Sequence, residues 1–502
     1  MIFLSRYSLI GALVIVAGMR STARASDRGE NALPDASARF SSGDASPIPQ
    51  EPWWSAFQSD ELNQLMEKAL TANPDLETAR SQARQATAIA ATGVTAFTPS
   101  VYLDAQLGIM PSESMSFGQV QPSYDDLLTP LYEALSQMGI ELDSTETPAD
   151  DTTLSDTIKS GSAAATVSLP IDLWGAGVQN WHAGRWDARA ATATVDALRL
   201  TITTSVARTW LDLVTSTARV EIVSAQIQSS EDILVLTEMR HTNGETNALE
   251  VLQQRQQVAS TRTLLPQART LQRIAQQQLA VLLGESPTQP RDAQTRTLPT
   301  LPVQPPIGTP TQLAQRSPTV LVALAQLTAA QHREAATIRS MLPALSASAS
   351  YGPQFYNYDG ENWESDSYWS VGLSANMAIF KSGSAVHGVR ATRAGADAAG
   401  HQLESTVLSA IQRVENALIM ESEQQRQFAL AQEMQDAAQA AMAMALQQYR
   451  SGLINHIPVI SAQQSALSAA LSLLQASRDL LDSRIQLHAA LGSVASPDGE
   501  TQ

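Results

Sequence analysis

The stretch GETNALEVL at residues 244–252 occurs a second time, in altered form, as GLINHIPVI at residues 452–460. In both copies a glycine is followed, at identical spacings, by three aliphatic residues. A second pair of glycines follows at Gly284 and Gly492, and 452 minus 244 and 492 minus 284 both give 208. This agreement indicates an internal duplication, because a chance similarity between helices rich in Ala, Leu and Gln would not also match glycines.

The duplication extends towards the amino terminus. Asn73-Pro74 corresponds to Ser317-Pro318, and a second proline follows each of these after 25 residues, at Pro99 and Pro343. A segment with seven prolines in 26 residues separates the two copies and has the composition of an extended linker. The predicted organisation is a first repeat at 51–284, a linker at 285–310, a second repeat at 311–492, and polar tails at 26–50 and 493–502.

Each repeat contains one unusually long helix. No proline occurs between Pro170 and Pro266 or between Pro353 and Pro458, and apolar residues recur at spacings of three and four in both intervals. This pattern predicts helices at about 177–240 and 384–450 that pack as coiled coils. The glycines at 244 and 452 interrupt the pattern, so each helix is expected to reverse there through a turn with positive φ. The return helices are expected at about 249–283 and 457–491.

Four segments alternate between apolar and polar residues, which is typical of strands with one apolar face. They form two hairpins, with strands expected at about 100–108 and 163–174 in the first repeat, and 344–352 and 368–380 in the second. The loop of the first hairpin, 109–160, is long and contains ten Asp or Glu but one Lys. A solvated surface loop is its expected role.

The amino terminus has the features of an export signal. Arg6 precedes an apolar stretch of 11 residues, Ser8 to Gly18, which is too short to span a bilayer. Ala23-Arg24-Ala25 fits a cleavage site, so residues 1–25 are predicted to be removed and Ser26 to begin the mature chain. Met19 stands where a bacterial lipoprotein would have its lipidated Cys, so no lipid anchor is expected. No other segment resembles a transmembrane helix, and a membrane role would therefore use the strands.

Composition excludes several functions. The formal net charge of −17 disfavours nucleic-acid binding, and the absence of Cys rules out disulfides and cysteine-based chemistry. The seven histidines show no metal-ligand spacing, and Gly175-Ala176-Gly177 lacks the third glycine of a dinucleotide-binding motif. The chain is therefore expected to be no enzyme, with no catalytic residues, no metal and no cofactor.

The strands themselves restrict the assembly. Amphipathic strands span a bilayer only in a closed barrel, which needs about eight strands or more, so four per chain would require an oligomer. A small soluble sheet in a helical protein would alternate in the same way and is the alternative. In a barrel, the residues expected to face lipid are Val167, Leu169, Val371 and Leu373. Those expected to face a wet lumen are Thr166, Ser168, Asp172, Ser370 and Ser374.

An ordered set of motifs resembles the TolC-like outer-membrane efflux protein family, near the branch that serves resistance–nodulation–division pumps. The residues that carry the resemblance, over about 51–492, are Trp53-Trp54, Ala69-Leu70-x2-Asn73-Pro74, Ile171-Asp172-Leu173-Trp174-Gly175, Gly244-x4-Leu249-Glu250-Val251-Leu252, Leu279-Ala280-Val281-Leu282-Leu283-Gly284, Ile379-Phe380-x2-Gly383 and Tyr449-Arg450-Ser451-Gly452.

The resemblance implies the fold class: a mainly α chain with membrane β-strands, internally duplicated. Long coiled-coil helices would form an α-barrel, and four strands per protomer would contribute to a trimeric, 12-stranded outer-membrane β-barrel. It also implies the partners, which are two further copies of the chain, a periplasmic adaptor, an inner-membrane pump reached through the adaptor, and outer-membrane lipid. The implied location is the outer membrane of a Gram-negative bacterium, with a long periplasmic extension.

The resemblance places the periplasmic tip of the assembly at the helix reversals. Gly244, Leu249, Gly452 and Ile457 are expected to form the turns that dock the adaptor, and Tyr449 and Arg450 to help hold a closed state. Relatives often have an Asp nine residues after the second-repeat glycine, but Ser461 occupies this position and Gln253 its first-repeat equivalent. Any constriction at the tip is therefore not an Asp ring at that position.

The expected function is a passive exit duct of a tripartite efflux system. Two alternatives remain at this stage. One is the outer-membrane component of a type I protein secretion system, which shares the architecture. The other is a helical periplasmic scaffold that does not conduct.

Overall fold

The computed structural model describes residue 40 and residues 52–111, 157–289, 292, 294–357, 362–378 and 383–492. The predicted signal peptide, both polar tails, most of the acidic loop and the Ile379-Phe380 motif lie outside these residues. The chain divides into two compact units. The helical unit comprises Met1–Ala91, Trp181–Ala335 and Val389–Gln502, and the sheet unit comprises Thr92–Asn180 and Ala336–Gly388.

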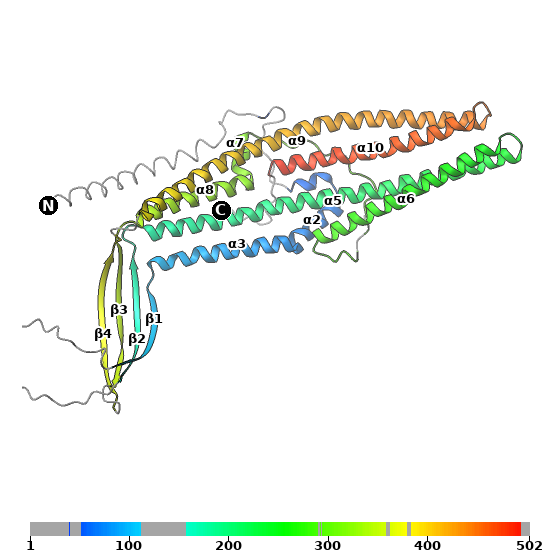
Figure 1. Ribbon diagram of the computed structural model, residues 1–502. Coiled ribbons are helices and arrows are strands. Elements are labelled where there is room, and N and C mark those ends of the chain that lie inside the picture. Colours follow the sequence, from blue (N-terminus) through cyan, green and yellow to red (C-terminus); the bar gives the residue numbers. More distant parts are fainter. Residues whose placement is uncertain are drawn as a thin grey trace, which may run out of the picture. The chain divides into compact units, whose positions relative to one another are not determined.

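The same order of elements occurs twice, which confirms the duplication (Figure 1). Two short helices lead into a strand hairpin, a helix of 67 residues and a return helix of 35 residues. The first copy follows the short helix η1 (Trp53–Phe57) and consists of α2 (Asp60–Ala72), α3 (Pro74–Thr92), η2 (Gly93–Phe97), β1 (Ser100–Pro111), β2 (Thr157–Ile171), α5 (Ala176–Thr242) and α6 (Ala248–Leu282). The second consists of α7 (Pro310–Arg316), α8 (Pro318–Arg339), β3 (Ala344–Asn357), β4 (Glu364–Asn376), α9 (Ser384–Arg450) and α10 (His456–Ala490).

Each return helix ends against the proline that separates the first two helices of its own repeat. Gly284, just beyond α6, has φ +70°, and a Cβ added there would lie 2.3 Å from the Ala72 carbonyl oxygen. The Asn73 amide Nδ2 donates a hydrogen bond of 2.8 Å to the carbonyl oxygen of Leu282. Gly492 lies in the same way against Ser317 in the second repeat. The motifs that revealed the duplication are therefore the contacts that close each repeat on itself.

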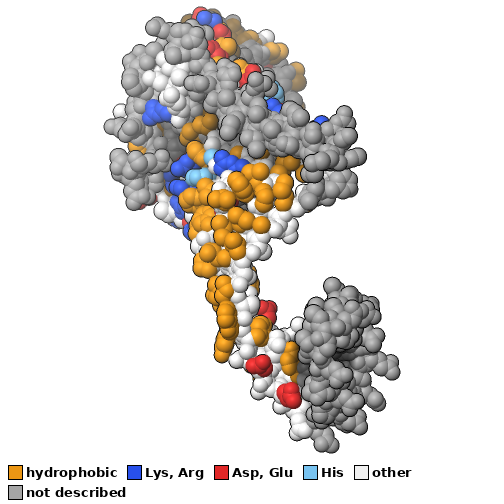
Figure 2. All heavy atoms as spheres, turned by 90° about the vertical axis from the view of Figure 1, so that its left-hand side faces the viewer, with side chains coloured by type: hydrophobic (Ala, Val, Ile, Leu, Met, Phe, Trp, Pro, Cys, Tyr) orange, Lys and Arg blue, Asp and Glu red, His pale blue; other side chains and the backbone are white. Residues whose placement is uncertain are grey.

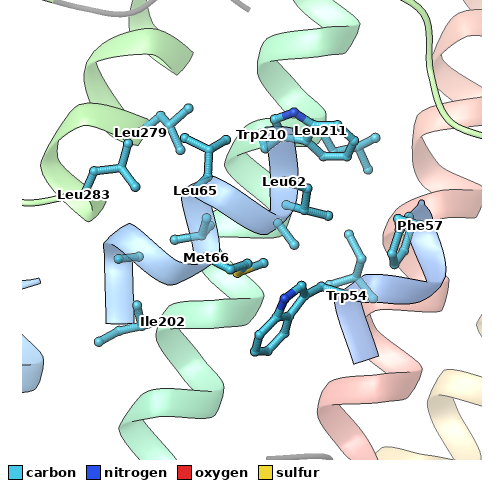
Figure 3. Close-up of a cluster of buried hydrophobic side chains, with 14 of the residues drawn as sticks. Trp54, Phe57, Leu62, Leu65, Met66, Ile202, Trp210, Leu211, Leu279 and Leu283 are labelled. Atoms are coloured by element: carbon cyan, nitrogen blue, oxygen red, sulfur yellow. The ribbon is translucent and has the colours of Figure 1, made fainter. Parts of the chain in front are cut away.

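The main core of the helical unit joins η1, α2, α5 and α6 (Figure 3). Its buried members include Leu62 and Met66 of α2, which follow the i, i+4 spacing of one helix face. Trp210 of α5 is fully buried there, and its indole Nε1 donates a hydrogen bond to the Glu61 carboxylate at 3.1 Å. The large side chain of Trp210 thus packs into this core and also makes a partly buried polar contact.

Part of the proline-rich linker is held by buried or half-buried charges. Glu61 also accepts backbone hydrogen bonds from Gln294 and Thr295, at 2.9 and 3.0 Å. Burial raises the pKa of Glu61, but its hydrogen bonds outweigh this effect and leave the pKa below its ordinary value. Further along the linker, the carbonyl oxygen of Pro302 accepts a hydrogen bond from Arg484 of α10, which also pairs with Glu421 of α9. Polar contacts therefore hold the proline-rich linker in place, although few of its residues belong to a hydrophobic core.

The sheet unit contains a four-stranded antiparallel sheet in the order β1-β2-β3-β4. The two hairpins pair through β2 and β3, so strands from different repeats lie side by side at the centre. Val167 pairs with Ala349, which pairs in turn with Val371. Because directly paired residues share a face, the apolar positions of the strands fall in rows on one side.

The strand boundaries differ from those predicted. β1 extends to Pro111 and β2 begins at Thr157, so both ends of the expected acidic loop belong to the hairpin. β3 continues to Asn357, and β4 occupies Glu364–Asn376, about four residues earlier than expected. Alternation reveals where side chains change face but not where the backbone pairing starts and stops.

The assignment of Asp172 to a lumen-facing strand position is wrong. β2 ends at Ile171, and Gly175 turns the chain with φ +73° into α5. The Asp172 carboxylate accepts a hydrogen bond of 2.9 Å from the backbone N–H of Val178, in the first turn of α5. A carboxylate at this place satisfies a helix N-terminal donor, so Asp172 acts in helix initiation.

The sequence predicted no transmembrane helix in the mature chain. Judged by length and hydropathy alone, this prediction is also wrong. Among the described residues, α10 is long enough and, with a mean hydropathy of 1.3, apolar enough to cross a bilayer. Its side chains nevertheless join the bundle. Gln463 is buried and donates to the Ser230 hydroxyl at 3.3 Å, and Arg484 is 2% exposed against Glu421. Of the apolar window in α10, 17% is buried within the chain.

Candidate functional site

Both long helices reverse through turns of the same construction. Gly244 has φ +76° and Gly452 has φ +73°, as the sequence predicted. In each turn the residue after the glycine donates its N–H to a carbonyl oxygen five residues earlier: Glu245 to Arg240 at 2.8 Å, and Leu453 to Gln448 at 2.9 Å. This is the pattern in which a left-handed glycine ends an α-helix. The two repeats thus present the same backbone geometry with different side chains.

Large apolar side chains stand exposed just beyond these turns. Leu249 is 60% exposed and Ile457, its repeat equivalent, is 57% exposed. Leu252 and Leu453 are exposed by 60% and 76%. These four side chains place apolar surface close to both turns.

Tyr449, one turn before the second glycine, is buried and makes contacts between the repeats. The guanidinium carbon of Arg240, on α5, lies 4.5 Å from the centre of the Tyr449 ring. Arg240 also donates a hydrogen bond to the backbone carbonyl oxygen of Tyr449. The phenol hydroxyl donates to the Glu250 carboxylate at 3.3 Å, and Thr237 Oγ1 lies 3.4 Å away. One side chain of α9 therefore joins both helices of the first-repeat hairpin.

The electrostatics of this cluster favour a neutral phenol. Burial raises the pKa of Tyr449 and the Glu250 carboxylate raises it further, against opposing effects of Thr237 and Arg240. The tyrosine therefore remains a hydrogen-bond donor. Arg240 also lies 3.3 Å from the Glu245 carboxylate, so one cation serves the turn and the inter-repeat contact together.

A buried polar seam continues from Tyr449 away from the turn. The His456 ring lies 5.2 Å from the Tyr449 ring, and its Nε2 is 2.9 Å from Gln254 Oε1. Gln254 Nε2 in turn donates to the carbonyl oxygen of Ser230 at 2.8 Å. Burial lowers the pKa of His456, although the Glu250 carboxylate opposes this effect. A neutral imidazole that donates from Nε2 to the glutamine oxygen fits this arrangement.

The structure brings together some of the predicted tip residues and separates others. Tyr449 forms the contact between hairpins, but Arg450 is exposed at the end of α9, and no ion pair to it occurs within the described part of the chain. Ser461 is exposed and Gln253 is half-buried, whereas the neighbouring Gln254 is fully buried.

Sequence reasoning missed Arg240, Glu250, Gln254 and His456. Glu250 stood within the Gly244 motif, and the other signal was positional, because all four lie within ten residues of one of the two turn glycines.

The sheet offers a second set of predicted residues. Thr166 pairs with Ser350, which pairs with Ser370, and the Ser350 and Ser370 hydroxyls are 2.8 Å apart. Ser346 and Ser374 form the same contact at 2.8 Å. Val371 and Leu373 lie on the other face, exposed by 75% and 72%. One face is therefore a hydroxyl-rich surface and the other an apolar surface.

The paired positions sort the predicted residues as follows. The hydroxyl-rich face holds Thr166, Ser168, Ser370 and Ser374, and the apolar face holds Val167, Leu169, Val371 and Leu373. Over the ranges that the structure describes, no group of three or more His, Cys, Asp or Glu side chains is arranged to hold a metal ion.

Comparison with known proteins gives consistent matches. The family model described as outer membrane efflux protein matches residues 65–285 and 309–493. The pyoverdine export outer membrane protein OpmQ of Pseudomonas aeruginosa is 28% identical, over 97% of this chain and 96% of its own length.

Solved structures show the same fold. The outer-membrane channel OprN matches with a TM-score of 0.74 at 24% identity, over 92% of this chain and 97% of its own. The Campylobacter jejuni CmeC outer membrane channel matches with a TM-score of 0.75 at 18% identity, over 94% of this chain and 93% of its own. The fold is thus shared with these channels, and the match to the family model shows that the chain belongs to the outer membrane efflux protein family.

Proposed function

We propose that this outer membrane efflux protein works as a homotrimer that forms the passive exit duct of a tripartite pump. The observation that supports this best is the open sheet, in which β1 and β4 are edge strands. Unpaired edges cannot be tolerated in lipid, and four strands cannot close a barrel. Three copies would supply twelve strands, which lies within the range of known outer-membrane barrels.

In this assembly the apolar face of the sheet, with Val167, Leu169, Val371 and Leu373, would contact outer-membrane lipid. The hydroxyl-rich face would line a wet lumen, where Thr166, Ser168, Ser370 and Ser374 would meet water. A lumen of this kind has no fitted pocket, so cargo selection would fall to the pump and the adaptor.

The turns at Gly244 and Gly452 would form the periplasmic tip, where three chains would present six of them in a pseudo-sixfold ring. The exposed side chains Leu249 and Ile457 would dock the helical hairpin of a periplasmic adaptor, which would connect the duct to an inner-membrane pump. Such docking suits an apolar patch that is rimmed by polar residues.

The contacts of Tyr449 with Arg240 and Glu250 would hold the tip closed in the resting state, because they tie the two hairpins of one chain together. Arg450, which stands exposed on the same helix end, would contribute through a neighbouring copy. Opening would then require the adaptor to replace these contacts with its own.

The mature chain would begin at Ser26 after signal cleavage and would carry no lipid, so the barrel alone would anchor it in the outer membrane of a Gram-negative bacterium. The relative OpmQ is named for pyoverdine export. This name supports export of small molecules over type I protein secretion as the duty of the present chain.

Single-channel conductance of the purified protein in planar bilayers tests the proposal, together with migration of a heat-resistant trimer in gels. Conductance from a trimer is the expected result. A trimer that never conducts, even with the tip variants described below, would favour a non-conducting scaffold. Growth of a deletion strain on toxic small molecules, compared with secretion of a reporter protein, would separate efflux from type I secretion.

A further inference from the structure

Two arginines occupy equivalent places in the two repeats, shortly after each hairpin. Arg185 is the tenth residue of α5 and Arg393 the tenth residue of α9, and they are 208 positions apart, as are the glycines that define the duplication. Both side chains are exposed. Arg185 follows the last residue of β2, Ile171, by 14 positions. Nine residues of helix separate it from the start of α5, which corresponds to a rise of about 14 Å.

The contacts of α5 identify its neighbours near Arg185. On one side Asp187 pairs with Arg333 of α8. On another side Gly184 lies against Ala90 of α3. Successive residues of a helix are 100° apart, so Trp181, Arg185 and Arg189, which are spaced by four, share one face of α5, and both arginines on it are exposed.

Aromatic rings lie beneath two of these cations. The guanidinium carbon of Arg185 lies 5.0 Å from the centre of the Trp181 ring, and that of Arg189 lies 4.2 Å from the Trp186 ring. Within the described residues, neither arginine has a carboxylate partner. Such stacking holds a guanidinium in place while its N–H donors remain available to an anion.

The local charge contrasts with that of the whole chain, which carries −17. No Asp or Glu occurs between Asp172 and Asp187 or between Asp366 and Asp397, and the second interval contains Arg390 as well as Arg393. In Figure 2, blue and pale blue side chains gather in one area of the face that is shown. The stretches that contain Arg185 and Arg393 therefore carry no acid of their own, and the acid nearest to Arg185, Asp187, is paired with Arg333.

We propose that Arg185 and Arg393, with Arg189 and Arg390 beside them, bind the phosphate groups of anionic phospholipid headgroups on the periplasmic side of the outer membrane. The proposal rests on the proposed function, in which the sheet crosses that membrane. Guanidinium groups bind phosphate through two parallel hydrogen bonds, and tryptophan is enriched at membrane interfaces. A trimer would carry six such repeat-equivalent arginines, which together we call the basic collar.

The basic collar is tested by measuring which lipids remain bound to the purified full-length protein. The trimer is extracted from vesicles of phosphatidylcholine and phosphatidylglycerol in equal parts, and the retained lipid is quantified by mass spectrometry. We expect phosphatidylglycerol to be enriched in the wild-type sample. Each arginine near an anionic surface contributes about a fivefold preference, so Arg185→Gln with Arg393→Gln should abolish most of this enrichment.

The matched control is Arg269→Gln with Arg273→Gln, which removes the same charge from exposed positions of α6. The adjacent Gln272 bonds to Thr217 of α5, 32 residues beyond Arg185, or about 48 Å along the helix. This control should retain the enrichment. Equal retention of both lipids by the wild type, or equal loss in both double variants, would overturn the proposal.

Conductance in neutral bilayers separates this proposal from the proposed function. Both double variants should conduct as the wild type does, because the proposed role of these arginines is to bind lipid. Loss of conductance by the wild type itself would count against the duct and not against the arginines.

Discussion

The guanidinium of Arg240, near the end of α5, stacks at 4.5 Å on the ring of Tyr449, near the end of α9, and donates a hydrogen bond to the Tyr449 backbone carbonyl oxygen. The two residues are 209 positions apart and belong to different repeats. This pair joins the two hairpins near the turns through a cation–π interaction and a charged hydrogen bond.

Arg240→Gln and Tyr449→Ala are therefore expected to raise the conductance of the isolated trimer. Each change removes a cation–π contact of roughly 0.5–2 kcal/mol. Tyr449→Ala with Arg450→Ala should act in the same direction, and Arg450→Ala alone measures the share of that residue. Single-channel recording at low voltage is the measurement.

Arg255→Gln is the matched control, because Arg255 pairs with Glu238 at 2.8 Å within the first-repeat hairpin and does not reach α9. Its conductance should remain that of the wild type. Unchanged conductance in Arg240→Gln and Tyr449→Ala as well would mean that other residues keep the tip shut.

The turn glycines give a second prediction. Gly244 and Gly452 have φ values of +76° and +73°, where a β-branched residue costs roughly 1–2 kcal/mol or more. An added Cβ at Gly244 meets no atom within 4 Å, so Gly244→Val would strain the backbone without a clash. Gly244→Val and Gly452→Val should spare the trimer but abolish efflux, measured as drug susceptibility of a complemented deletion strain.

Gly395→Val serves as the control for the valine itself. Gly395 lies inside α9 with no atom within 4 Å of an added Cβ, so the substitution keeps the helix and leaves both turns intact. Efflux should persist. Normal efflux in the two turn variants would contradict their assignment to adaptor docking.

How far the sequence could predict this structure depended on the kind of signal. The helix α9 begins and ends where it was predicted, because Gly383 and Gly452 bound a long interval that contains no proline. The end of β2 could not be predicted in this way. Leu173 continues the apolar alternation, yet the backbone already turns after Ile171. The period of a pattern shows which residues share a face, but hydrogen bonding decides where a strand stops.

The partner of Tyr449 could not be predicted for a different reason. The sequence placed Arg450 next to Tyr449, and adjacency along the chain suggested that both act at one contact. In the structure Tyr449 points into the bundle and Arg450 out of it, since consecutive helical residues differ by 100°. The true partner, Arg240, depends on how the two coiled coils align, and no local pattern records that alignment.

The two faces of the sheet should tolerate charge differently. Val371→Arg or Leu373→Arg places a cation on the apolar face and should cost roughly 2–4 kcal/mol near the bilayer midplane. Ser370→Arg or Ser374→Arg on the hydroxyl-rich face should be tolerated and serves as the internal control. Yield of heat-resistant trimer in the outer membrane is the measurement, and equal yields from both faces would remove the barrel interpretation.

The mature amino terminus should be unmodified. Met19 occupies the position at which a lipoprotein signal would have Cys, so the start of the mature chain should be Ser26 without an acyl group. Intact-mass and peptide mass spectrometry of the protein from outer membranes measures this directly. A matched Met19→Cys variant tests the signal in the opposite sense, and an acylated wild-type terminus would contradict the prediction.

Stability of the helical unit should fall in mild acid because of His488. This residue is 6% exposed, its ring stacks at 5.5 Å on Trp53, and no partner for its Nε2 occurs in the described part of the chain. Burial and the positive charge of Arg484 lower the pKa of His488 to about 4 from 6.5.

The unfolded chain therefore binds a proton to this histidine at a higher pH than the folded chain does. Above about pH 6.5 the histidine is neutral in both states, and its stabilising contribution to the free energy of unfolding is fully present. As the pH falls towards 4, the free energy of unfolding decreases by on the order of 3 kcal/mol in all. His488→Phe preserves the stacking on Trp53 and removes the titrating group. Thermal midpoints of the assembled protein across this range should decrease more steeply for the wild type than for the variant, since other acids titrate equally in both. Parallel curves would show that His488 is protonated in the folded protein or accessible to solvent.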